Sequence, residues 1–129
     1  MGSTTLLPGE ATLVLFSKLL TKTDIETHLC ISTSSLGQLP FDGRQTVNMH
    51  VHDEGGRKWM FPCCIKEDEN MGRFLSVDWL EFARLKDVRV GDQFIIHEEI
   101  VKHQAAGTLI RIEVRRKIRL FGFDIWANV

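Results

Sequence analysis

With 129 residues, of which 43% are hydrophobic, the chain is long enough to bury the core of one domain and too apolar to be disordered throughout. No apolar run approaches the roughly 18 residues needed to span a bilayer, and the first residues lack the pattern of a secretory signal, so we expect an intracellular protein without membrane contact. The formal net charge of −1 excludes a strong overall attraction to nucleic acid, although residues 111–129 hold five Lys/Arg against two Asp/Glu.

The first half of the chain predicts strands on either side of a long connection. A run of strand formers at Thr12–Leu20 indicates the first strand. Residues 21–44 are polar and broken by glycine and proline, with room for one strand and one short helix. Thr46–Val51 alternates in polarity, and turn residues at 53–56 connect it to a partner strand at Lys58–Phe61.

The second half predicts one short helix followed by strands. Ser76, with an acidic residue two positions later, indicates the start of the helix. A turn at Gly91–Asp92 precedes a strand at Gln93–Ile96, and Thr108–Leu120 alternates as one long strand with a buried face and a basic face. This basic face is either solvated or a stripe for an anionic partner, and it carries Arg111, Arg115, Lys117 and Arg119.

Together these elements predict an all-β domain with a minor helical part. Six or seven short strands with one or two short helices suit a closed or nearly closed barrel, because closure leaves no long unpaired edge. We place this single domain at residues 12–127 and expect residues 1–11 to be a flexible leader. The core is predicted to be aromatic, formed by Trp59, Phe61, Trp79, Phe82 and Phe94.

Three stretches, in this order, resemble the plant B3 DNA-binding domain. Residues 15–24 are similar to the opening pattern of that family, and residues 56–61 are similar to its Gly-x-x-Trp-x-Phe hairpin. Residues 73–82, running on to Gly91-Asp92, repeat its spacing of aromatic and aliphatic residues before Gly-Asp. The resemblance implies a seven-stranded open pseudobarrel with two short helices. It also implies a sequence-specific transcription regulator of a plant nucleus that grips double-stranded DNA with two arms in the major groove.

The resemblance implies DNA contacts on both arms. The first arm, residues 22–35, and the second arm, residues 66–73, carry cations for phosphates and polar side chains for base edges. The phosphate contacts would come from Lys18, Lys22 and Arg73. The base contacts would come from Thr27, His28, Lys66 and Asn70, with Thr23 and Ser32 also at the interface.

The second arm also carries three successive carboxylates, Glu67, Asp68 and Glu69. Negative charge opposes the approach of phosphate unless such side chains point away or accept hydrogen bonds from cytosine amino groups.

The C-terminal segment is similar to a repression motif, Arg/Lys-Leu-Phe-Gly-Val, that follows B3 domains in some plant repressors. It reads Arg119, Leu120, Phe121, Gly122 and Phe123, with Phe in place of the final Val. The segment either finishes the barrel as core or recruits a corepressor. The second possibility gives an alternative function, a protein-interaction module on a B3-like fold that has lost DNA binding.

No other pattern predicts chemistry. Cys30, Cys63 and Cys64 are expected to be reduced thiols without metal-ligand spacing, and His50 and His52 share one face of a strand without a third ligand. The chain has no nucleophile constellation, phosphate-binding loop or dinucleotide fingerprint. We therefore expect no enzyme activity, no cofactor, no metal and no small-molecule substrate.

Overall fold

The computed structural model describes residues 10–32, 46–70, 72–101 and 108–129. This part of the chain holds eight strands and two short helices. The helices are α1 (Lys22–Glu26) and α2 (Leu80–Leu85). The strands are β1 (Glu10–Leu19), β2 (Leu29–Ser32), β3 (Thr46–His52), β4 (Lys58–Asp68), β5 (Gly72–Val77), β6 (Gln93–Val101), β7 (Thr108–Leu120) and β8 (Phe123–Asn128).

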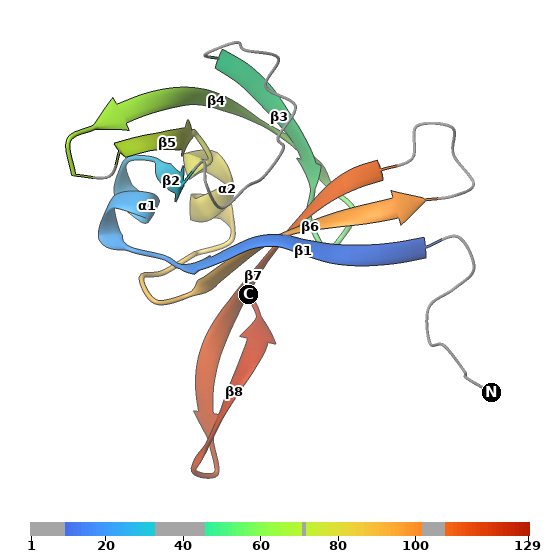
Figure 1. Cartoon of the computed structure of the whole chain (residues 1–129). Helices are drawn as coiled ribbons and strands as arrows, with labels where there is room; N and C mark the ends of the chain where they lie inside the picture. Colours follow the sequence, from blue (N-terminus) through green and yellow to red (C-terminus); the bar gives the residue numbers. More distant parts are fainter. Residues whose placement is uncertain (1–9, 33–45, 71, 102–107) are drawn as a thin grey trace.

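The strands form one sheet that curls into an open half-barrel, with both helices beside β2 and β5 (Figure 1). The strand order is β1-β6-β7-β3-β4-β5-β2, and β8 pairs with β7 outside this path. Neighbours are antiparallel except β3 and β7, which meet in parallel at His52 and Arg111. The predicted all-β class and the seven-stranded open pseudobarrel with two short helices are confirmed, and β8 is an additional strand.

An aromatic cluster fills the half-barrel, as the sequence predicts. Trp79, Phe82 and Phe94 are at most 2% exposed. Trp79 meets Phe94 edge to face with 5.2 Å between ring centroids, and Trp59 meets Phe82 in the same way at 5.2 Å. Phe61 completes the cluster at 5.9 Å from Phe82. Edge-to-face contacts of this kind add stability beyond the apolar area that they bury.

The helix α2 begins later than predicted. Ser76 is not its cap, because it lies in β5, opposite Cys30 on β2 and Cys64 on β4. Pairing with strands on both sides satisfies the backbone donors and acceptors of this segment, so the strand is favoured over an earlier helix start. The helix therefore begins at Leu80, with Trp79 in the N-cap position.

Two strands extend into segments that the sequence predicts to be irregular. β4 continues to Asp68 and returns at Gly72 as β5, so the second arm is a β-hairpin and not a loop. β1 begins at Glu10, within the predicted leader, because its backbone pairs with Val101 of β6. Residues 1–9 lie outside the described residues, as do residues 33–45 of the long connection.

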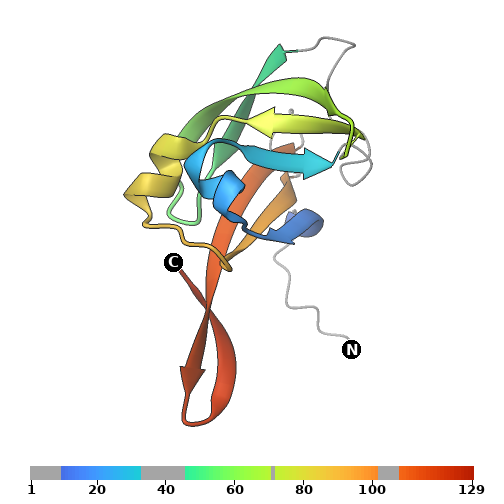
Figure 2. The same ribbon diagram turned by 90° about the vertical axis from the view of Figure 1, so that its left-hand side faces the viewer.

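The C-terminal segment does not finish the barrel. Its strands, β7 and β8, form a hairpin that projects from the body (Figures 1 and 2). Leu120 is 48% exposed, Phe121 89% and Phe123 73%. The interpretation of these side chains as core residues is therefore wrong, since no element within the described ranges covers them.

A polar cluster lies near the point where β3 meets β7. His97 Nε2 and Glu113 Oε1 are 2.7 Å apart, and both side chains are buried. Arg115 Nε donates to the other oxygen of Glu113 at 2.9 Å, and Arg111 pairs with Glu99. Much of the predicted basic face of this strand is thus engaged by carboxylates, which weakens it as a stripe for an anionic partner.

This cluster predicts a pH-dependent stability that involves Glu54. Burial, and a hydrogen bond that places a shared proton between Glu54 and the ionised Glu113, raise the pKa of Glu54 to about 7. The pKa of Glu54 is thus higher in the folded protein than its ordinary value of 4.5. Its contribution to the free energy of unfolding is therefore complete below about pH 4.5 and is lost as the pH rises through 7. The variant Glu54→Gln cannot ionise but keeps a hydrogen-bond donor. We expect its free energy of unfolding, relative to that of the wild type, to be about 1 kcal/mol more favourable at pH 8 than at pH 5.

Urea unfolding at pH 5 and pH 8 measures this difference. The exposed Glu81→Gln on α2 is the matched control and should show no such gain. A stability difference for Glu54→Gln that is equal at both pH values would contradict the shared proton.

Candidate nucleic-acid interface

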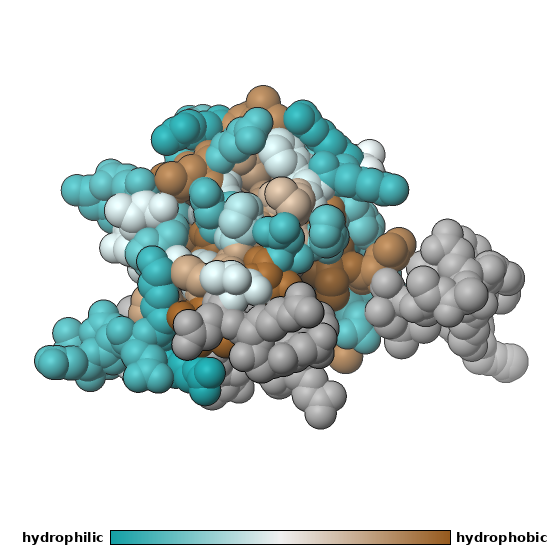
Figure 3. Space-filling model, turned by 90° about the horizontal axis from the view of Figure 1, so that it is seen from above, coloured by the Kyte–Doolittle hydropathy of each residue, from teal (hydrophilic) through white to brown (hydrophobic). Residues whose placement is uncertain are grey.

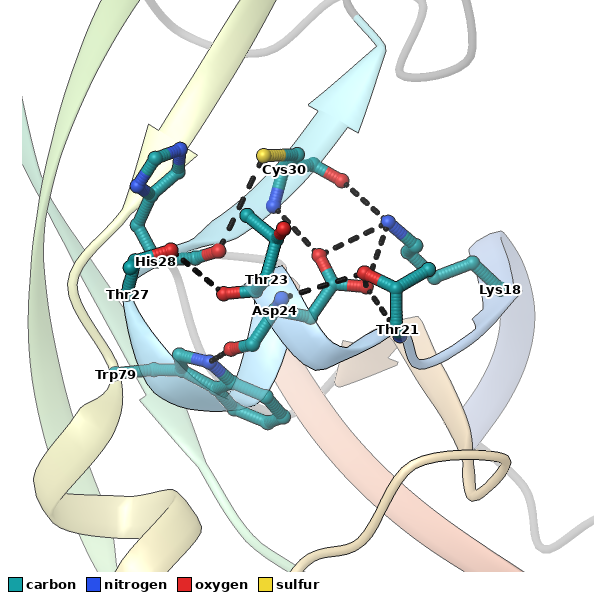
Figure 4. Close-up of polar contacts among 8 residues, drawn as sticks. All are labelled: Lys18, Thr21, Thr23, Asp24, Thr27, His28, Cys30 and Trp79. Carbon is teal, nitrogen blue, oxygen red and sulfur yellow. Dashed lines mark hydrogen bonds and ion pairs between the residues drawn. The ribbon is translucent and has the colours of Figure 1, made fainter.

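The base of the first arm is fixed by the buried carboxylate of Asp24 (Figure 4). Lys18 Nζ and the backbone N–H of Cys30 donate to its Oδ1 at 3.0 and 3.1 Å. The backbone N–H and hydroxyl of Thr21 donate to its Oδ2 at 2.8 and 2.9 Å. The backbone N–H of Asp24 in turn donates to Thr21 Oγ1 at 3.3 Å, which completes a capping box at the start of α1.

These donors keep Asp24 ionised inside the protein. Burial by itself would raise the pKa of Asp24, but hydrogen bonds from Thr21, Cys30 and Lys18 outweigh it and hold the pKa below its ordinary value of 3.8. An ionised group that accepts several hydrogen bonds fixes the positions of all its donors. The end of β1, the start of α1 and the start of β2 are therefore held at one point.

Trp79 connects this point to the core. Its indole Nε1–H donates to the backbone oxygen of Asp24 at 2.7 Å, in the buried interior (Figure 4). The same ring stacks on Phe82 and meets Phe94, so the arm rests on the aromatic cluster. Rigid support of this kind reduces the entropy that an arm would lose on binding a partner.

The outer part of the first arm presents polar side chains. Thr27 is exposed, and its hydroxyl donates to the backbone oxygen of Thr23 at 2.8 Å. His28 is half-buried, and its ring stacks on Phe74 of β5 with 6.1 Å between centroids and an interplanar angle of 14°. The stack holds the imidazole against the sheet between the first arm and the second.

The second arm is the β4–β5 hairpin, and its two faces differ. Lys66 lies opposite Phe74, and Glu67 lies opposite Arg73. Because side chains alternate along a strand, Lys66 shares the face of Phe74, whereas Glu67 and Arg73 share the other face. One of the three acidic residues is engaged in the turn, since Asp68 Oδ1 accepts the backbone N–H of Asn70 at 2.8 Å.

A shallow hollow of about 670 Å³ lies between the two arms. Among the residues predicted to contact DNA, it brings together Thr27, His28 and Lys66. Further polar residues that the sequence analysis did not select line the same hollow, and these are Thr46, Asn48, Ser76 and Asp78. Seen from above, the surface of the molecule is mostly hydrophilic, with apolar side chains showing between the polar ones (Figure 3).

The alternation of residues on β3 contains a sequence signal for two of these additional residues. Thr46 and Asn48 alternate with apolar residues on β3, and they lie opposite Cys64 and Pro62 of β4. They therefore share the face of Lys66 once the register is known. From the sequence alone, this alternation indicates only a half-buried strand. It does not reveal which strand pairs with β3, or that the outer face of β3 lines the hollow.

The remaining predicted residues occupy different positions. Lys18 donates to Asp24 and to the backbone oxygen of Cys30, both at 3.0 Å, so it supports the arm from inside. Lys22 is largely exposed on α1, 4.0 Å from Glu26. Ser32 is exposed at the end of β2, where it lies opposite Phe74. Asn70 lies at the tip of the second arm, and Arg73 lies on the hairpin face away from Lys66.

Within residues 10–32, 46–70, 72–101 and 108–129, no three His, Cys, Asp or Glu side chains gather closely enough to hold a metal ion. No helix in those ranges is long and apolar enough to cross a membrane.

Comparisons with known proteins identify the fold. No family model matches the sequence, and no curated protein matches it. Among solved structures, the chain is similar to a chain of the Arabidopsis FUS3–DNA complex, with a TM-score of 0.65 and 14% identity. The alignment covers 81% of this chain and 98% of that chain. Likeness at this identity shows the fold, which is that of the B3 domain, as the three sequence stretches predict.

The Asp24 network predicts a large effect of one isosteric substitution. Asp24→Asn replaces two acceptor oxygens with one and turns an N–H₂ group towards existing donors. We expect the free energy of unfolding at pH 7 to fall by about 2–4 kcal/mol, because buried donors lose their acceptor. Urea unfolding followed by tryptophan fluorescence measures the change.

Asp78→Asn, at an exposed acid beside the hollow, is the control and should have little effect on stability. The folded pKa of Asp24 is lowered, so the deficit of Asp24→Asn should shrink as the pH falls from 3.8 through that lower folded value. A deficit that does not change with pH would show that Asp24 does not act through its charge.

Proposed function

We propose that this chain is a sequence-specific double-stranded DNA-binding domain of a plant transcription regulator that acts in the nucleus. The observation that carries the proposal is the hollow between two supported arms, which unites Thr27 and His28 of the first arm with Lys66 of the second. The likeness to a chain of a FUS3–DNA complex supports the same conclusion.

The shape of the site suits the major groove. A major groove is about 12 Å wide and admits a two-stranded ribbon or a helix, and its base edges present donors and acceptors. The β4–β5 hairpin is such a ribbon, and α1 with the start of β2 offers the second projection. Polar side chains on two supported projections can read adjacent base pairs at a low entropic cost.

We assign the contacts by side-chain chemistry. Thr27, His28, Lys66 and Asn70 would meet base edges, with Thr23 and Ser32 at the flanks. Lys22 and Arg73 would hold phosphates on either side. Lys18 would position the first arm through Asp24, because its ammonium group already has two partners there.

The electrostatics predict weak non-specific binding. The net charge is −1, and β7 cations such as Arg115 and Arg116 are paired with the buried acids Glu113 and Asp92. Affinity would therefore depend on a small number of phosphate contacts together with base contacts, and not on a broad basic surface.

The alternative is a module that binds a partner protein through Arg119–Phe123, with a corepressor as the partner. Exposure of Leu120, Phe121 and Phe123 supports accessibility of this segment. We rank it second because Leu120 and Phe123 pair across a tight turn, so the segment presents one face of a hairpin and not an extended peptide.

The assignment of Lys66 predicts a change in salt dependence. A random-sequence duplex pool titrated by fluorescence anisotropy, from low to physiological salt, should show binding that weakens with salt. If Lys66 contacts phosphate as well as bases, Lys66→Ala should reduce the slope of log K against log salt by about 1. Lys58→Ala, an exposed lysine at the other end of β4, is the matched control and should leave the slope unchanged.

The two possible failures have different meanings. Absence of binding by the wild type even at low salt would overturn the DNA proposal and favour the partner-binding alternative. Binding with equal slopes for Lys66→Ala and Lys58→Ala would retain DNA as the ligand and exclude a phosphate contact by Lys66.

The stacked position of His28 predicts an effect on sequence preference. His28→Ala removes a ring that is held by Phe74 beside the hollow. We expect the motif selected by this variant from a random pool to differ from that of the wild type at one or two adjacent positions. Loss of a base contact typically costs 1–3 kcal/mol in discrimination, or about 5- to 150-fold. An unchanged motif would contradict base contact by His28.

A further inference from the structure

The β7–β8 hairpin carries an apolar surface that the proposed DNA site does not use. Ile118 lies opposite Ile125, and Leu120 lies opposite Phe123. Alternation along the strands puts these four side chains on one face, which we call the hairpin face, with Phe121 at its tip. Their exposed fractions range from 41% for Ile118 to 89% for Phe121.

The hairpin is fixed to the body at its base. Arg116 donates to both carboxylate oxygens of Asp92, at 3.0 and 2.9 Å, and to the backbone oxygen of Asp87 at 2.8 Å. The backbone N–H of Val129 donates to the backbone oxygen of Val114 at 2.9 Å. At the tip, Phe121 and Gly122 have φ values of 52° and 82°, as a two-residue type I′ turn requires. The hairpin face is thus presented in a preformed arrangement.

Next to the tip, charge lies on the opposite side of the hairpin, whereas Arg116 lies on the hairpin face at its base, where it is paired with Asp92. Lys117 and Arg119 alternate with the apolar residues of β7, and Asp124 lies opposite Arg119. Lys117 Nζ is 3.4 Å from a carboxylate oxygen of Asp124. Two hairpin faces placed against each other would therefore bring together apolar side chains, while Arg116 at the base of each face is already paired with Asp92.

We propose that the hairpin face is the contact surface of a weak two-fold symmetric homodimer. Such a contact is isologous, so one apolar patch serves both copies and the assembly closes at two. The hairpin projects away from the half-barrel, so its tip lies apart from the body (Figure 2). Covering the five side chains in both copies would remove on the order of 1,000 Å² from water, near the lower limit for a specific interface.

A lipid surface is the competing occupant, because cations flank the apolar tip. The charge on the chain favours a second copy instead. Asp124 neutralises Lys117 beside the tip, and the net charge of −1 gives no overall attraction to an anionic membrane. Homodimer formation is independent of the proposed DNA binding, and its test contains no DNA.

Sedimentation of the whole chain between about 5 and 500 μM tests the proposal, as this range suits an interface at the lower size limit. The average mass should rise with concentration from that of one 14.8 kDa chain towards twice that value. The double variant Phe121→Asn/Phe123→Thr should associate at least about ten-fold more weakly. Asn suits the positive φ at position 121 and Thr suits a strand, so the hairpin itself should persist.

Val90→Ser provides the matched control, since Val90 is 62% exposed and lies outside the hairpin; it should dimerise as the wild type does. A wild type that stays monomeric over the whole range would overturn the proposal. So would a dimer that the double variant leaves intact. Vesicles of phosphatidylcholine with phosphatidylserine are included in parallel, and binding by a monomer that is lost in the double variant would identify a lipid surface as the occupant.

Discussion

The buried carboxylate of Asp24 is the interaction on which the geometry of the site depends. It accepts hydrogen bonds from three successive elements, the end of β1, the cap of α1 and the start of β2. The backbone oxygen of the same residue accepts the indole N–H of Trp79 from the core. A charge that is buried and fully partnered tolerates little displacement, because each lost hydrogen bond leaves a desolvated group unpaired. The first arm is consequently held at a defined position relative to the sheet.

Two other buried aspartates organise two further connections in the same way. Asp53 accepts the backbone N–H groups of Gly55 and Arg57 and the indole N–H of Trp59 in the β3–β4 turn. Asp92 accepts the backbone N–H of Arg89 and two hydrogen bonds from Arg116, which joins the turn before β6 to the base of the hairpin. Buried acidic side chains thus hold the backbone of these turns in place, and cations such as Lys18 and Arg116 are paired with them. The polar surface left between the arms is suited to selective contacts more than to a strong general attraction for phosphate.

Much of the candidate site could be anticipated from residue type and order. Thr27, His28 and Lys66 follow the resemblance to the B3 pattern, and the structure places them around one hollow. The separation of Lys66 from Arg73 on opposite hairpin faces could not be anticipated, because it depends on the register of β4 with β5. The sequence also did not reveal that Lys18 supports the first arm from inside. Its partner Asp24 lies six residues away, and the burial of Asp24 depends on the packing of α1 against Trp79.

The sequence by itself determined the class of fold and the aromatic core, because alternation of apolar residues and the spacing of Trp and Phe are local properties that survive without knowledge of partners. Tertiary structure decided which strands pair, where they end and which faces remain in water. β4 and β5 continue through polar residues since each supplies the other's backbone hydrogen bonds, and those bonds do not depend on side-chain type. The apolar residues of the last hairpin stay exposed for a related reason: β8 pairs with the end of β7 alone, and no other described element reaches the side chains of this pair.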